Sequence, residues 1–123
     1  MIDRSELSGD EAEFANAWGV ADEFVFRRVL REARRSHEAG ERFLSLVLTT
    51  SNHRPFTYPE GRIDIPSGEG RAGAVKYTDW AIGSFIAEAR KEDFFRDTVV
   101  VIVADHCASS AGELDIPIDQ YHI

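Results

Sequence analysis

Two stretches of the chain carry apolar residues at the spacing of one helix face. The first begins at Asp22, a predicted N-cap, and is expected to end at Gly40. Its apolar positions recur at intervals of three and four residues: Phe26, Val29, Leu30 and Ala33. The second helix is predicted over 72–91, with an apolar stripe made by Val75, Ile82, Phe85, Ile86 and Ala89.

Two shorter stretches, 42–50 and 98–104, are apolar and rich in β-branched residues, which predicts buried strands. Because the helix at 72–91 lies between them along the chain, we expect a parallel pair joined by a right-handed crossover. The chain of 123 residues has room for one domain. The predicted fold class is therefore α/β, a layered fold with a parallel β-α-β core and flanking helices over 1–123, in which 1–17 is loosely ordered.

Polar residues follow both predicted strands. The first strand runs into a loop over 51–71, which holds three of the four prolines and begins with Ser51, Asn52, His53 and Arg54. A loop of about 20 residues is usually functional or mobile. The second strand ends on Asp105 and His106. Since ligands bind at the carboxyl ends of parallel strands in open α/β sheets, the two segments are expected to meet at one rim.

The chemistry of this rim is that of a divalent metal and an anion. Asp105 offers an oxygen donor and His106 a nitrogen donor, a set that suits zinc or manganese better than magnesium. His53 and Arg54 could both donate hydrogen bonds to a phosphate or sulfate oxygen. The alternative is that Asp105 caps the following turn and the histidines are surface residues.

One carboxylate falls inside the predicted apolar stripe of the second helix. Asp79 is expected to project with Val75, Ile82 and Ile86, and a buried carboxylate must be hydrogen-bonded or paired. A structural hydrogen bond is one interpretation of its role. Support for His53 or His106 is the other.

Composition excludes several classes of function. The net charge of −8 argues against a nucleic-acid surface, which needs a basic face. A single cysteine, Cys107, excludes an internal disulfide and a cysteine-based zinc site. No apolar run approaches the ~20 residues of a membrane-spanning helix, and the acidic amino terminus has no targeting signal, so the chain alone is expected to be soluble.

Four ordered motifs carry a resemblance to a known family: "LTTSNHRPFTYP", "KYTDWAIGSFIAEA", "DTVVVIVADH" and "YHI". Together with "WGVADEFVF" at 18–26, they resemble the carboxyl-terminal part of the extracytoplasmic sulfatase-like domain of lipoteichoic acid synthase and related phosphoglycerol transferases. These enzymes belong to the alkaline phosphatase superfamily. The resemblance implies a partial alkaline-phosphatase-like fold over about 18–123.

The resemblance also implies roles for individual residues. Asp105 and His106 match the pair that binds the catalytic divalent metal, which is commonly manganese or magnesium, with zinc or calcium in relatives. His53 matches the histidine that contacts the phosphoryl group, and Arg54 follows it in the same motif. His122 in "YHI" has no assigned metal role and is expected to be structural. The intact protein is expected in the bacterial inner membrane, with this domain outside the cytoplasm.

The nucleophile and a further acidic metal ligand of the family lie upstream of the resembled region. Thr49, Thr50 and Cys107 do not match the nucleophile motif, so no catalytic residue is identifiable. We therefore expect part of a metal-dependent phospho- or sulfo-ester transferase or hydrolase, inactive alone and with a weakly bound metal.

Two other functions remain open from the sequence: a non-catalytic truncated domain for assembly or partner binding, and a stand-alone phosphatase with a site shared across a dimer. A parallel sheet cut in this way would expose an edge and an apolar face. Homo-oligomerisation through these surfaces is the expected consequence.

Overall fold

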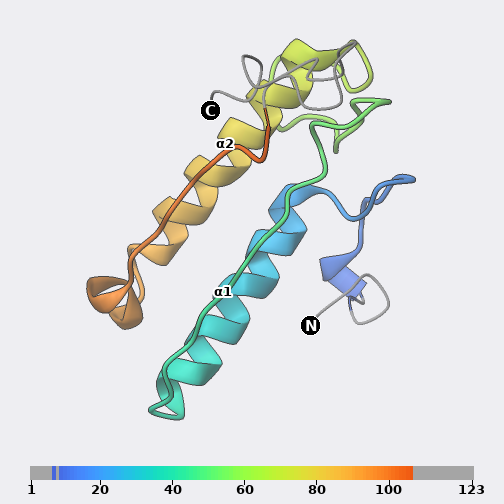
Figure 1. Cartoon of the computed structure of the whole chain (residues 1–123). Helices are drawn as coiled ribbons and strands as arrows, with labels where there is room; N and C mark the ends of the chain where they lie inside the picture. The colour runs from blue at the N-terminus through green and yellow to red at the C-terminus, as the bar shows by residue number, and fades with distance from the viewer. Residues whose placement is uncertain (1–6, 8, 107–123) are drawn as a thin grey trace, which may run out of the picture.

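The computed structural model describes residue 7 and residues 9–106 of the chain. Two α-helices, α1 (Asp22–Glu38) and α2 (Arg71–Ala89), lie side by side (Figure 1). Two short 3₁₀ helices, η2 (Gly9–Glu11) and η3 (Asp93–Asp97), accompany them. Within these described residues no strand is assigned, and the pairing of backbone outside helices is limited to one isolated bridge between Ala15 and Val20.

Both helices predicted from the apolar spacing are confirmed. The first ends as expected before Gly40, whose φ of +70° is a left-handed conformation that glycine adopts without steric cost. The prediction that Asp22 is the N-cap is wrong: Ala21, with φ −61° and ψ 144°, occupies that position and Asp22 is the first helical residue. The Asp22 carboxylate reaches other parts of the chain instead.

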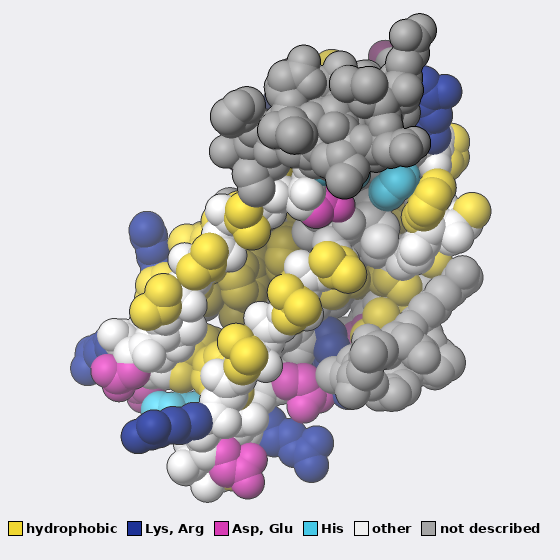
Figure 2. Space-filling model, viewed as in Figure 1, with side chains coloured by type: hydrophobic (Ala, Val, Ile, Leu, Met, Phe, Trp, Pro, Cys, Tyr) yellow, Lys and Arg dark blue, Asp and Glu magenta, His cyan; other side chains and the backbone are white. Residues whose placement is uncertain are grey.

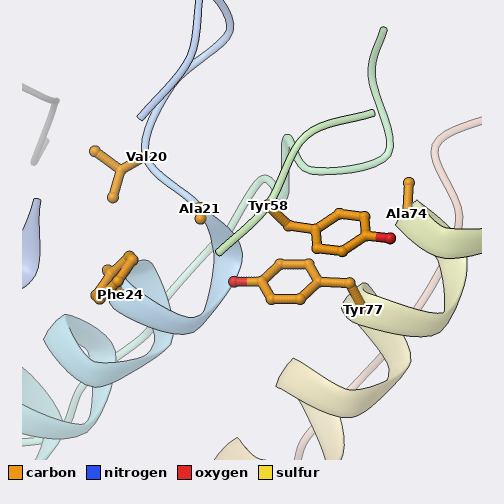
Figure 3. Close-up of a cluster of buried hydrophobic side chains, with 6 residues drawn as sticks. All are labelled: Val20, Ala21, Phe24, Tyr58, Ala74 and Tyr77. Atoms are coloured by element: carbon orange, nitrogen blue, oxygen red, sulfur yellow. The ribbon is translucent and has the colours of Figure 1, made fainter. Parts of the chain in front are cut away.

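The core forms where the start of α1, the 51–70 loop and the start of α2 meet. Six buried residues make up this cluster (Figure 3): Val20, Ala21, Phe24, Tyr58, Ala74 and Tyr77. The rings of Tyr58 and Tyr77 stack with centroids 4.9 Å apart and an interplanar angle of 7°. The Tyr58 hydroxyl group lies 3.1 Å from the carbonyl oxygens of both Ile65 and Pro66. The loop is thus folded against the helices by an aromatic stack and by its own hydrogen bonds.

The face that α2 buries differs from the predicted stripe. Its buried residues include Ala74, Tyr77, Thr78 and Ala81, whereas Val75 is 49% exposed. Asp79 is exposed, so the prediction of a carboxylate inside the core is wrong. The reason is that α2 packs against α1 through a row of small and tyrosine residues, and most of the predicted stripe points elsewhere.

The two predicted strands are extended segments that run beside the helices. The segment 42–50 follows α1, and 98–104 follows α2, both in the same direction (Figure 1). Their apolar side chains are exposed, with Leu44 at 95% and Val99 at 87%. No backbone hydrogen bond joins the two segments within the described part of the chain. Because a strand is defined by its ladder, the parallel pair stays a prediction.

A buried carboxylate ties three parts of the chain together. Asp22 has no exposed surface, and its Oδ1 accepts hydrogen bonds from the backbone N–H groups of Thr50 (2.9 Å) and Ser51 (3.1 Å). Its Oδ2 accepts one from the Thr78 hydroxyl at 2.9 Å. The Asp22 N–H donates to Ser51 Oγ at 3.2 Å. The starts of α1 and of the loop are therefore fastened to α2.

Residues 9–17 fold back onto α1. Glu11 is 2% exposed and forms ion pairs with Arg28 (3.1 Å) and Arg31 (2.7 Å) of α1. Asn16 Nδ2 donates to Thr57 Oγ1 at 3.1 Å, which links this segment to the loop. The expected loose order of 1–17 is not tested as a whole, because residues 1–6 and 8 lie outside the described residues.

The contact between Gly73 and Tyr58 leads to a prediction about stability. A methyl group at Gly73 would overlap the Tyr58 hydroxyl and meet Ile65 Cγ2 at 3.0 Å. Gly73→Ala is therefore expected to lower the free energy of unfolding by about 1–3 kcal/mol, measured by urea denaturation. Gly83→Ala is the matched control, since nothing lies within 4 Å of its added methyl group. The control is expected to gain about 0.5–1 kcal/mol, and equal effects of both changes would refute the close approach.

The Asp22 carboxylate generates a second prediction. Asp22→Ala leaves two backbone N–H groups and one hydroxyl without their acceptor, and the expected loss in the free energy of unfolding is about 3 kcal/mol or more. Asp79→Ala removes an equally charged side chain from an exposed position and is expected to change stability by about 0.5 kcal/mol or less. Thermal and urea unfolding of both variants test this. Similar losses in the two variants would contradict the assigned role of Asp22.

Candidate functional site

The two extended segments form the walls of a large groove whose floor is made by α1 and α2. Its volume is about 1430 Å³. Figure 2 shows two rows of hydrophobic side chains on this face, with further hydrophobic side chains in the hollow between them. The floor includes Val29 and Leu30 of α1 and Val75, Ile82 and Phe85 of α2. Much of the apolar stripe predicted for α2 therefore lines the groove.

All four residues predicted to form the site line this groove: His53, Arg54, Asp105 and His106. Since the two segments run in the same direction, their carboxyl ends lie towards the same end of the groove (Figure 1). All four side chains are exposed. The structure thus brings both motifs to one groove, as the strand-end argument predicts, while their roles toward a ligand remain predictions.

His53 is held by an aromatic stack. Its ring lies on that of Trp18, with centroids 3.8 Å apart and an interplanar angle of 16°. Stacking uses the ring faces and not the ring nitrogens, so it sets the ring plane without occupying a donor or acceptor atom. The backbone N–H of Trp18 donates to Asn16 Oδ1 at 2.8 Å, which holds the tryptophan segment in turn.

The backbone that carries His53 is positioned by the buried carboxylate described above. His53 N–H donates to the carbonyl of Thr50 at 3.1 Å, and the Phe56 N–H donates to the His53 carbonyl at 2.8 Å. The N–H of Thr50 itself donates to Asp22. Asp22 therefore supports the turn that presents His53 through the backbone of that turn.

Asp105 and His106 follow directly after the second segment. The His106 N–H donates to Asp105 Oδ1 at 3.0 Å, and His106 Nε2 lies 3.6 Å from Asp105 Oδ2. Together they present a carboxylate oxygen and an imidazole nitrogen at the surface. This donor set fits two positions in the shell of a divalent metal.

Among the described residues, no third ligand completes a metal-binding group with this pair. In residue 7 and residues 9–106, no group of three or more histidine, cysteine, aspartate or glutamate side chains could hold a metal ion. Cys107 and His122 lie outside the described residues. The assignment of Asp105 and His106 as metal ligands therefore stays a prediction, and the pair alone would supply two ligands.

The carboxylates of a second acidic pair, Asp22 and Glu23, accept hydrogen bonds from other parts of the fold. Glu23 is buried, and its Oε1 accepts a hydrogen bond from Arg62 Nε at 2.8 Å. Its other oxygen accepts one from Arg27 at 3.0 Å. Burial, with a further contribution from Glu23, raises the pKa of Tyr77 well above its ordinary value, so the hydroxyl stays protonated. The hydrogen bond from Arg62 to Glu23 raises the pKa of that guanidinium. This pair is therefore not a second metal site.

Sequence reasoning did not predict the supporting roles of several residues: Trp18, Asp22, Ser51 and Thr78. The motif "WGVADEFVF" contributed only to the family resemblance and gave no indication of these roles. Nothing in the helix spacing of Asp22 indicates that its partners lie 28, 29 and 56 residues away. One feature of the sequence could have indicated the role of Asp22: its carboxylate directly follows three small or apolar residues at the start of a helix.

Comparison with known proteins identifies the family. The family model described as Sulfatase matches residues 1–122. Phosphoglycerol transferase I of Xanthomonas axonopodis pv. citri (strain 306) is 31% identical over 99 residues, covering 76% of this chain and 14% of that protein. The protein of the same name from Escherichia fergusonii is 28% identical over 111 residues, covering 84% of this chain and 14% of that protein.

A solved structure is also similar. The crystal structure of a protein in the alkaline phosphatase superfamily from Vibrio parahaemolyticus matches with a TM-score of 0.85 and 35% identity. The match covers 98% of this chain and 30% of that chain. This likeness supports an α/β fold.

The chain spans about 14% of the length of the curated relatives it matches. None of its described helices is long and apolar enough to cross a membrane. The family model nevertheless covers nearly the whole sequence, and the superfamily of the structural neighbour agrees with it. The chain therefore belongs to the sulfatase family.

Proposed function

We propose that this chain supplies part of the active site of a metal-dependent transferase or hydrolase that acts on phosphate or sulfate esters. In this proposal Asp105 and His106 hold a divalent metal, and His53 and Arg54 bind the anionic group of the substrate. The observation that carries the proposal is that both motifs line one groove at the carboxyl ends of two segments with the same direction. Membership of the sulfatase family supports this class of substrate.

Each side chain contributes a definite chemical property. Arg54 carries a permanent charge and a fork of N–H donors that matches the oxygens of a phosphate or sulfate group. His53 offers ring nitrogens from a plane set by Trp18, so little reorientation is needed on binding. A bound manganese or magnesium ion would supply Lewis-acid stabilisation of negative charge next to Asp105 and His106.

The same residues explain why the chain by itself is expected to have little activity. Two protein ligands leave most of a metal's shell to water, which gives weak binding. Covalent catalysis also requires an activated nucleophile, and none is assigned in this chain. We therefore propose a parallel β-α-β core that becomes complete, with its catalytic groups, within a larger sulfatase-family domain, placed outside the cytoplasm at the bacterial inner membrane.

The exposed apolar segments have a consequence for the isolated chain. Leu44, Leu46 and Leu48 are at least 75% exposed, and Val99 and Val101 at least 78%. Contiguous apolar surface of this kind promotes association. We propose that the isolated chain self-associates through this open face at high concentration.

Manganese binding tests the metal assignment. The chain is expected to bind Mn²⁺ weakly, followed by electron paramagnetic resonance of the free ion. The double variant Asp105→Ala/His106→Ala is expected to bind about tenfold or more weakly than the native chain, because both protein ligands are lost. Phosphodiesterase activity with added Mn²⁺ is expected to be absent or barely detectable in both.

The matched control is Asp79→Ala/His37→Ala. It removes one exposed carboxylate and one exposed imidazole at positions that do not adjoin each other in the chain. This variant is expected to bind Mn²⁺ like the native chain. Equal binding by all three proteins, or equal loss in both variants, would refute the assigned ligands.

A further inference from the structure

Arg71, the first residue of α2, lines the same groove as His53 and Arg54. Within residue 7 and residues 9–106, the side chains of Arg54 and Arg71 are exposed and form neither an ion pair nor a hydrogen bond. Several basic side chains elsewhere are paired with carboxylates: Arg27, Arg28, Arg31, Arg34, Arg62, Lys76 and Lys91. The charges of Arg54 and Arg71 are therefore available to a ligand.

The charge of Arg71 is unfavourable at its place in the helix. α1 follows the usual rule, with the acidic residues Asp22 and Glu23 in its first turn and the basic residues Arg35 and His37 in its last turn. The first turn of α2 has no acidic residue, and Arg71 lies next to the partial positive charge of the helix start. Departures from local stability rules are typical of functional positions. The stability of α2 therefore does not account for an arginine here.

The loop between the two arginines is closed at its base. The Gly68 N–H donates a hydrogen bond to the carbonyl of Phe56 at 3.1 Å. Arg54 precedes Phe56 by two positions, which is at most about 7 Å of extended chain. Arg71 follows Gly68 by three positions, at most about 11 Å. The hydrogen bond therefore brings both arginines to the base of the loop, where both line the groove.

Two unpaired arginines on one groove favour a ligand with more than one negative charge. A guanidinium group presents a fork of N–H donors that matches two oxygens of a phosphate or carboxylate group. A ligand with two anionic groups can engage both forks, whereas a singly charged ester gains one set of charge-assisted hydrogen bonds. Since the net charge of the chain is −8, anion binding depends on such locally unpaired cations.

We propose that Arg71 is a further substrate-binding residue and that it binds a second anionic group of the substrate, beside the ester group bound by His53 and Arg54. This inference rests on the proposed function, because the first anionic group is the one assigned there. It narrows the substrate class to phosphate or sulfate esters that carry another anionic group.

Arg42 provides a matched control. It is also exposed, lines the groove and is unpaired within the described residues. It lies at the start of the extended segment 42–50, which runs along α1 before the chain reaches His53 (Figure 1). Arg42→Ala therefore removes the same charge from the same groove, at the end of the segment away from the loop.

The test compares two ligands with the same carbon chain, n-propyl phosphate and propane-1,3-diyl bisphosphate. Binding to the full chain is measured by NMR titration in metal-free buffer, so that no metal at Asp105 and His106 bridges the ligand. The native chain is expected to bind the bisphosphate about tenfold or more tightly than propyl phosphate. Arg71→Ala is expected to abolish this preference and to change the affinity for propyl phosphate by about twofold or less. Arg42→Ala is expected to keep the preference.

A structural role of Arg71 would give a different result. Arg71→Ala removes a cation from a helix start and is expected to unfold at the same or a higher temperature than the native chain. Arg71→Lys keeps the charge but loses the fork, so its affinity for the bisphosphate is expected to be intermediate. A lower unfolding temperature of Arg71→Ala, together with equal losses of affinity for both ligands, would overturn the proposal.

Arg54→Ala distinguishes failure of this inference from failure of the proposed function. This variant is expected to bind both ligands about tenfold more weakly. Unchanged binding of propyl phosphate by Arg54→Ala would refute the proposed anion site, and the second-group assignment with it. If Arg54→Ala shows the expected loss, equal affinity of the native chain for both ligands would refute the inference alone. The same preference for the bisphosphate in Arg71→Ala and Arg42→Ala would also refute it alone.

Discussion

The buried carboxylate of Asp22 is the interaction on which the rest of the structure depends. Burying a charge is costly unless it is hydrogen-bonded, and Asp22 accepts hydrogen bonds from Thr50, Ser51 and Thr78. These donors belong to the end of the first extended segment, the start of the loop and α2. A single side chain therefore sets where the segment ends, where the loop turns and how the two helices meet. Charge-assisted hydrogen bonds of this kind are stronger than neutral ones, which suits a joint between distant parts of a chain.

This joint gives the groove its rim. Because Thr50 is held by Asp22, the turn that follows presents His53 in a defined place, and stacking on Trp18 sets the ring plane. The Tyr58–Tyr77 stack holds the remainder of the loop against α2. On the side of His53 the rim is thus held by hydrogen bonds and ring stacking, whereas the walls of the groove are extended segments with exposed apolar side chains. The chain spans 14% of its curated relatives' length and 30% of its structural neighbour, and its two extended segments share no backbone hydrogen bond within the described residues.

The helices could be predicted because their periodicity is local. Spacing alone placed both of them to within about two residues, the usual uncertainty of helix ends. The buried face of α2 could not be predicted, because apolar residues occur on two sides of that helix and the sequence does not say which side meets α1. For the same reason Asp79 was expected in the core and is exposed. The extended segments were recognised by composition, but strand pairing depends on partners outside them.

The sequence could predict the two motifs of the candidate site. It could not predict which residues hold those motifs in place. His53, Arg54, Asp105 and His106 were identified because each follows an apolar run, and all of them line one groove. The groups that position His53 lie far away in the sequence, which no local pattern encodes. Trp18 precedes His53 by 35 positions, and Asp22 precedes Thr50 by 28 positions, with the rest of α1 between them.

Hydrogen exchange of the isolated chain, followed residue by residue by NMR, tests this account most directly. The account predicts slow exchange at Thr50 and Ser51, whose N–H groups donate to the buried Asp22 carboxylate. It predicts fast exchange at 44–48 and 99–103, where the backbone forms no backbone hydrogen bond within the described residues. Slow exchange in both extended segments of the monomer, or fast exchange at Thr50 and Ser51, would contradict it.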